Sequence, residues 1–174
     1  MTSSHNYSQL ITWIYAFSCI GLLIYLAKVD LKTFRLPNVF TYLLIFCGIA
    51  YNTLSSTPFC SIIESCLGAL LGFSILWGAN RLYRYIRNHD GMGMGDAKLL
   101  SGIGAILGIP TVLPLLLLAS ILGSIGGLIW LKLNRQSLKN YFPFGPYLAL
   151  AGILGILDEV LTLNLLKSLS ELNY

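Results

Sequence analysis

Two aspartates stand out in a chain that is otherwise very apolar. Asp96 follows the run Gly91–Gly95, in which every second residue is glycine, and Asp30 follows the first apolar segment. An ionisable residue at membrane depth costs free energy unless it is paired or functional. Two carboxyls that lie close together cannot both ionise cheaply, so one keeps its proton while the other deprotonates a water molecule. This pattern predicts a water-activating pair, the chemistry of an aspartic protease.

The residues around Asp96 favour a catalytic role. We expect Gly93 and Gly95 to give a backbone that a substrate chain can approach closely, and Lys98 either to steady the Asp96 charge or to anchor a helix among lipid headgroups. The alternative is that Asp96, at or near the N-cap of a helix over 97–109, only caps that helix. Because of this helix N-terminus, we expect Asp96 to ionise more readily than Asp30.

Asp30 also has a simpler interpretation. Juxtamembrane charges are common, and Asp30 can be an interfacial residue paired with Lys28 or Arg35. A second irregular stretch, 142–146, falls on the same predicted side as both aspartates. It either shapes a substrate entry or forms the turn that starts the last helix, where proline is favoured.

Composition places the chain among integral membrane proteins. Of its 174 residues, 56% are hydrophobic and 10% are charged, and the mean hydropathy is +0.74; soluble domains usually contain about 25% charged residues. The net charge of +4 is spread over short loops, which does not suggest nucleic-acid binding. The four cysteines contain no Cys-x-x-Cys pair, so we predict small buried side chains, no metal site and no cofactor.

Six apolar segments predict an all-α, polytopic membrane protein with about six transmembrane helices. Three of them are long enough to cross a bilayer, which takes roughly 20 residues, and three are short. We interpret residues 1–174 as one membrane domain, in which 158–174 either prolong the last span or lie in the interface as an amphipathic helix, the placement we favour. The segments are 9–27, 38–51, 60–79, 97–109, 111–131 and 143–157.

The basic residues predict the orientation. With six spans, ten of the eleven Lys and Arg residues lie on one side, and only Lys167 lies on the other. Because cytoplasmic loops carry the excess of basic residues, we expect that side to be cytoplasmic, with both aspartates on it and both termini outside. The ten are Lys28, Lys32, Arg35, Arg81, Arg84, Arg87, Lys98, Lys132, Arg135 and Lys139.

Three stretches together resemble the type IV prepilin peptidases, membrane aspartic proteases that process pilins and pseudopilins. Residues 93–98 are similar to the family's Gly-x-Gly-Asp-x-Lys signature, residues 30–38 to its aspartate followed by basic residues and Pro-Asn, and residues 143–149 to its late Pro-Phe-Gly-Pro stretch. The resemblance implies an inner-membrane endopeptidase that cuts a short basic leader after a glycine, next to the substrate's hydrophobic helix. It makes Asp30 and Asp96 the catalytic pair, and it makes the following residues site-shaping: Gly93, Gly95, Lys98, Arg35, Pro37, Asn38, Pro143, Phe144 and Gly145.

The sequence differs from many bacterial members of this family in its cysteines. Many bacterial members carry a cytoplasmic insert with two Cys-x-x-Cys pairs, associated with N-methylation. The sequence contains no such pairs, so we expect peptidase activity without methyltransferase activity, zinc or S-adenosylmethionine.

Three other functions are alternatives to a prepilin peptidase. They are a presenilin-like intramembrane protease, a small transporter that uses the aspartates as ion sites, and a non-catalytic scaffold for pilus assembly. Midplane carboxylates would favour the transporter.

Overall fold

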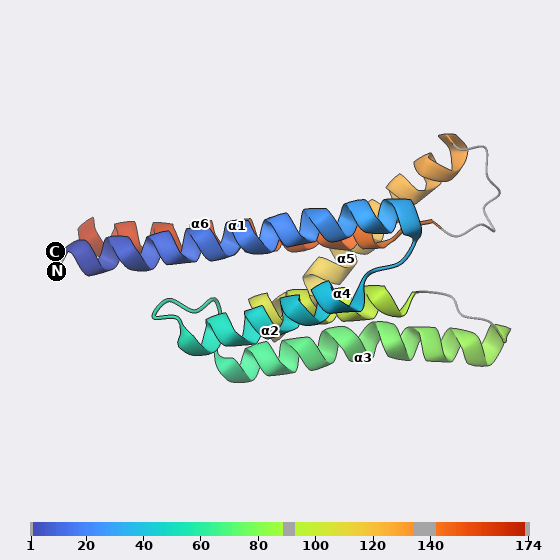
Figure 1. Ribbon diagram of the computed structural model, residues 1–174, viewed down its shortest axis with the longest axis horizontal. Coiled ribbons are helices and arrows are strands. Elements are labelled where there is room, and N and C mark those ends of the chain that lie inside the picture. The colour runs from blue at the N-terminus through green and yellow to red at the C-terminus, as the bar shows by residue number, and fades with distance from the viewer. Residues whose placement is uncertain (1, 89–92, 134–141, 173–174) are drawn as a thin grey trace.

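The computed structural model describes residues 2–88, 93–133 and 142–172, and all regular structure in these ranges is helical (Figure 1). Each predicted segment corresponds to one helix, so the all-α prediction is confirmed. The observed helices extend beyond most of the predicted apolar segments. They are α1 (Thr2–Thr33), α2 (Asn38–Leu54), α3 (Ile62–Arg87), α4 (Met94–Leu107), α5 (Ile109–Leu133) and α6 (Gly145–Leu172).

The helices form two groups joined by α5. Helices α1 and α6 lie side by side, and α2 and α3 both pack against α4. Helix α5 contacts α3, α4 and α6, and in Figure 1 it runs obliquely between the two groups. The C-terminal end of α1 and the N-terminal ends of α4 and α6 therefore come together at one end of the molecule.

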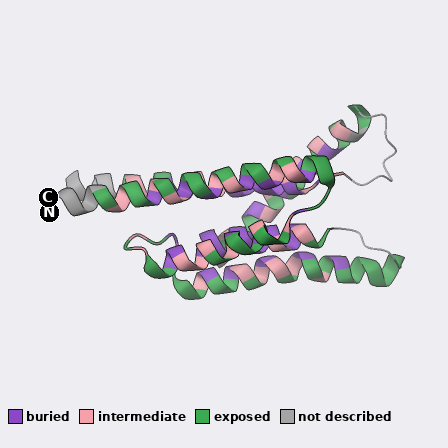
Figure 2. Cartoon of the chain, in the orientation of Figure 1, coloured by how far each residue is buried: buried purple, intermediate pink, exposed green. Residues whose placement is uncertain are grey.

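Helix α4 is the buried centre of the bundle (Figure 2). Apart from Lys98, every residue from Asp96 to Leu107 is buried, as expected for a helix that is apolar on all sides. Small residues let α3 approach closely, because a Cβ at Gly68 would meet the backbone of Gly104. Since protein rather than lipid surrounds α4, its 14 residues are enough for its place in the fold.

Four helices are long and apolar enough to cross a membrane. The spans are Tyr7–Thr33, Ile62–Arg87, Ile109–Trp130 and Gly145–Leu165, and Asn38–Leu54 is a shorter apolar helix. The prediction of a membrane-protein architecture therefore fits the structure, whereas the count of six crossings stays a prediction.

The residues after 157 do not form a separate helix. Helix α6 runs without a break from Gly145 to Leu172, so residues 158–172 prolong the last predicted segment. Their placement in the membrane interface stays a prediction.

Candidate active site

Asp30 lies in the last turn of α1 and is held by the start of α6. Its side chain is only 5% exposed, and its Oδ2 accepts a hydrogen bond from the backbone N–H of Gly145, 3.1 Å away. A Cβ at residue 145 would stand 2.7 Å from that oxygen. Only glycine therefore lets the start of α6 approach Asp30 this closely, and the third sequence motif meets the first through this contact.

Asp96 enters the same end of the bundle from α4. The N-cap of α4 is Gly93, so Asp96 is the third residue of the helix and lies near the N-cap, as expected. Its N–H donates to the Gly93 carbonyl at 3.2 Å, and its carboxyl is buried, with 8% of the residue exposed. Gly93 has no side chain to cap α4, and Asp96 is the acidic residue in the first turn, where a negative charge favours the helix N-terminus.

The charge of Asp30 acts on the carboxyl of Asp96. Asp96 lies outside the four long spans, and burial together with the negative charge of Asp30 raises the pKa of Asp96 to about 7. Burial thus outweighs the helix N-terminus and Lys98 in setting this pKa, and the order in which the two aspartates ionise stays a prediction. A carboxyl with such a pKa exchanges its proton near neutral pH, which suits general acid–base catalysis.

Gly95 lets the linker between α1 and α2 pack on the first turn of α4. A Cβ at Gly95 would lie 2.8 Å from the Cβ of Leu36, a buried residue of that linker. This contact brings the Asp30 stretch against the Asp96 stretch. Gly95 therefore shapes the junction of the two motifs. The Cβ position at Gly93 is 3.8 Å from Asp96 Oδ2, which is ordinary contact.

Lys98 has a partner that the sequence did not indicate. Its Nζ donates to Asn38 Oδ1 at 2.7 Å and lies 5.0 Å from the centre of the Tyr42 ring. The bond joins the first turn of α2 to the first turns of α4. Lys98 therefore links the two motifs, a role different from the two we had expected.

The remaining residues of the first motif build the turn that joins α1 to α2. Phe34 adopts a left-handed conformation with φ 52°, and its ring packs edge-on against Trp130 of α5, 5.9 Å between centroids. Arg35 is exposed, and its carbonyl accepts a hydrogen bond from Thr33 Oγ1. Pro37 is the N-cap of α2. These three residues direct the chain from Asp30 towards Asn38.

The third motif starts α6, and its aromatic rings pack on α5. Pro143 is buried, and the Phe144 carbonyl accepts hydrogen bonds from the backbone N–H groups of Tyr147 and Leu148 in the first turn of α6. The rings of Phe142, Phe144 and Tyr147 fill the space beside Gly127, Gly123 and Gly126 of α5, where a Cβ would collide with or crowd them. The stretch is thus a helix-starting turn that sets Gly145 against Asp30.

Polar residues at the other end of the bundle were not singled out from the sequence. The buried Asn52 donates to the carbonyls of Ala105 and Ile106 and accepts from the N–H of Phe59. Glu64 forms a capping box with Ser61 at the start of α3. The Ser-x-x-Glu spacing was the available signal for that cap.

Acid–base hydrolysis is the chemistry that two buried carboxyls suit. The site provides two buried carboxyls, one bound to a backbone N–H and the other titrating near neutrality under the influence of the first. Carboxyls that share a site differ in protonation state, so one can act as a base while the other acts as an acid.

Comparison of the sequence with known proteins identifies a family. The family model described as the type IV leader peptidase family matches residues 17–128, well over half of the chain. The chain belongs to this family. Both aspartates lie within the matched residues, while Gly145 lies beyond them. The recognition made from the three motifs is therefore confirmed.

Curated relatives agree with the family match. A prepilin leader peptidase/N-methyltransferase of Dickeya chrysanthemi is 35% identical over 146 residues, covering 84% of this chain and 51% of the relative. Proteins of the same name from Pectobacterium carotovorum subsp. carotovorum and Aeromonas hydrophila are each 34% identical, over 79% and 85% of this chain and 49% and 48% of the relatives. The chain thus spans about half the length of these proteins. No solved structure matches it.

Proposed function

We propose that this protein is a membrane-embedded aspartic endopeptidase that removes the short basic leader of type IV prepilins or pseudopilins. One observation carries the proposal. Asp30 is buried and accepts a hydrogen bond from the Gly145 N–H, and the negative charge of Asp30 acts on Asp96. Membership of the type IV leader peptidase family and the names of the curated relatives support the choice of substrate.

In the proposed reaction the two aspartates share one proton. The ionised carboxylate takes a proton from a water molecule, whose oxygen attacks the scissile carbonyl carbon, while the protonated carboxyl donates its proton to the carbonyl oxygen. The tetrahedral intermediate then collapses as the leaving nitrogen is protonated, so that the peptide C–N bond breaks and the carboxyl pair regains its starting charge. No metal or cofactor takes part.

The neighbouring residues position this pair. The Gly145 N–H fixes one carboxyl oxygen of Asp30, and the Lys98–Asn38 bond holds the starts of α2 and α4 together. Gly93 leaves room beside Asp96 for a substrate backbone. The net negative charge of the pair attracts a basic leader, whose removal leaves the hydrophobic helix of the substrate in the bilayer.

We place the reaction at the cytoplasmic face of the bacterial inner membrane. Eight of the nine described basic residues lie at helix ends or in the α1–α2 linker at the end of the bundle that carries the aspartates; Lys167, near the end of α6, is the exception, and Arg135 and Lys139 lie outside the described residues. The positive-inside rule favours a cytoplasmic location for this end. The first turn of α1 and the last turn of α6 lie at the opposite end in Figure 1, which supports our placement of both termini outside. The partners are the prepilin substrate and membrane lipid, with no nucleic acid.

Co-expression with a candidate prepilin tests the proposal. Wild-type protein should shorten the prepilin on a gel, and Asp30→Asn and Asp96→Asn should each leave it uncut while remaining in the membrane fraction. Pilin assembly without any cleavage would favour the scaffold alternative. Cleavage of helical substrates that lack a basic leader would favour a presenilin-like protease. Aspartate-dependent proton or ion uptake into vesicles, without cleavage, would favour the transporter.

The absence of N-methylation stays a prediction. Mass spectrometry of the new N-terminus of the cleaved pilin should find an unmethylated amine when this chain is the only enzyme present. A methylated amine under those conditions would contradict it.

A further inference from the structure

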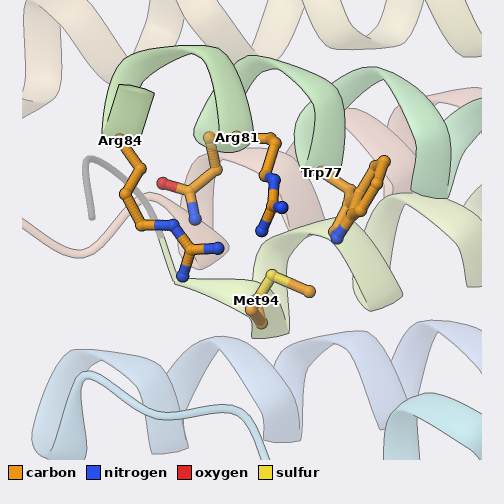
Figure 3. Close-up of a pocket in the computed structure, with 5 residues that line it drawn as sticks. Trp77, Arg81, Arg84 and Met94 are labelled. Atoms are coloured by element: carbon orange, nitrogen blue, oxygen red, sulfur yellow. The ribbon is translucent and has the colours of Figure 1, made fainter. Parts of the chain in front are cut away.

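A basic cavity lies between α3 and the start of α4, outside the aspartate pair. It has a volume of about 210 Å³ and is lined by Trp77, Asn80, Arg81, Arg84 and Met94. In Figure 3 the side chains of Arg81, Arg84 and Trp77 project from α3 towards Met94 in the first turn of α4. None of these residues has a role in the proposed cleavage.

The polar part of the cavity suits a phosphate group. Guanidinium groups bind phosphate oxygens through paired N–H donors, and Arg81 and Arg84, three residues apart, lie on one face of α3. Asn80, which is 9% exposed, adds an amide to the same lining. The described residues that line the cavity include two guanidinium groups and no carboxylate.

The apolar part continues as an exposed stripe along α3. Ile63, Leu67, Leu70 and Trp77 are 67%, 44%, 63% and 45% exposed, and their spacing of four, three and seven residues puts them on one helix face that leads to Arg81 and Arg84. Ile63 and Trp77 are 14 residues apart, or about 21 Å along the helix, whereas one leaflet contributes about 15 Å to the hydrocarbon core. The stripe is therefore long enough for one acyl chain in one leaflet.

We propose that this cavity binds the headgroup phosphate of an anionic glycerophospholipid, whose acyl chain lies along the α3 stripe. Tryptophan is typical of the level where headgroups meet acyl chains, and basic pockets between transmembrane helices on the cytoplasmic side bind anionic headgroups. The bound lipid contacts Met94, two residues before Asp96, and so stabilises the first turn of α4. This inference does not depend on the cleavage reaction.

Quenching of Trp77 by brominated lipid tests the proposal directly. In a Trp13→Phe/Trp130→Phe background, Trp77 is the single tryptophan. In phosphatidylcholine nanodiscs, a small fraction of brominated phosphatidylglycerol should quench it more than the same fraction of brominated phosphatidylcholine. Because one basic residue contributes about 1 kcal/mol of attraction near an anionic surface, Arg81→Gln and Arg84→Gln should each lower the preference about fivefold.

The matched control removes two charges elsewhere at the same end of the molecule. Arg87→Gln/Lys132→Gln should keep the preference that Arg81→Gln/Arg84→Gln loses. Equal quenching by the two lipids in the parent protein, or an equal loss in both double variants, would overturn the proposal. Native mass spectrometry of the unsubstituted protein gives a second readout, in which phosphatidylglycerol should remain bound longer than phosphatidylcholine.

A second experiment distinguishes a bound lipid from a bound soluble phosphate. Phosphatidylglycerol should raise the thermal unfolding temperature of the protein in nanodiscs, and inorganic phosphate added to phosphatidylcholine nanodiscs should not. Equal stabilisation by inorganic phosphate would show that the cavity takes a soluble phosphate, and the lipid assignment would then be wrong.

Discussion

Substitution of Gly145 by alanine should disable the site without unfolding the protein. The new Cβ would lie 2.7 Å from Asp30 Oδ2 and 3.0 Å from its Cγ, whereas ordinary contact begins at 3.4 Å. The carboxyl oxygen must therefore retreat by about 0.7 Å. Asp30 is buried and its backbone belongs to α1, so this retreat weakens the bond to the Gly145 N–H and misplaces the carboxyl.

The size of the effect follows from the precision that catalysis needs. A misplacement of about 1 Å can reduce the rate about 10²-fold, so we expect Gly145→Ala to lower kcat/KM by somewhat less than 10²-fold. The assay is leader removal from a purified prepilin, with melting temperature as the measure of folding. Gly78→Ala is the matched control, because nothing lies within 4 Å of a Cβ there. Wild-type cleavage by Gly145→Ala would refute the argument that this contact positions Asp30.

Three further predictions concern protonation, the link between the motifs and the packing of α4. Because the pKa of Asp96 is raised to about 7, the pair should lose its shared proton as the pH rises through that value, and the cleavage rate should fall on the alkaline side. Lys98→Met and Asn38→Ala should each lower the free energy of unfolding by about 1 kcal/mol, and the double variant should lose no more than either single one. Gly68→Ala should lower the free energy of unfolding by more than about 2 kcal/mol, because the new Cβ would meet the Gly104 backbone.

Each of these has a clear contrary result. A cleavage rate that stays constant from about pH 6 to about pH 9 would show that no carboxyl of the pair titrates there. Additive losses in the Lys98 and Asn38 variants, measured by denaturant unfolding in detergent, would mean that the two residues do not act through one bond. A Gly68→Ala variant as stable as Gly78→Ala would show that α3 and α4 do not depend on their close approach.

The helices and the family were predictable from the sequence because both depend on local patterns. Apolar segment length gave six helices, and the sign and position of charges put Asp30 and Asp96 at one end. The short segment 97–109 was harder to place, because length alone does not distinguish a short span from a buried helix. The structure shows that α4 is buried among the other helices, and whether it crosses the membrane stays a prediction.

Contacts between distant parts of the chain were beyond sequence reasoning. Nothing in the spacing of Lys98 and Asn38 shows that they bond, because helix periodicity says nothing about which faces of different helices meet. For the same reason the sequence did not indicate that Gly145 donates its N–H to Asp30. The sequence also did not indicate how strongly burial raises the pKa of Asp96, because burial depends on contacts between distant helices.

The most direct test of the central claim is the rate of leader release by purified protein in nanodiscs, measured under single-turnover conditions for four proteins. We predict that Asp30→Asn and Asp96→Asn each lower the rate by between about 10² and 10⁴-fold. The Asp30→Asn/Asp96→Asn variant should be no slower than the slower single variant, because residues that act as a unit are not additive. A single variant that cleaves at a rate close to that of the wild type would contradict the aspartate pair.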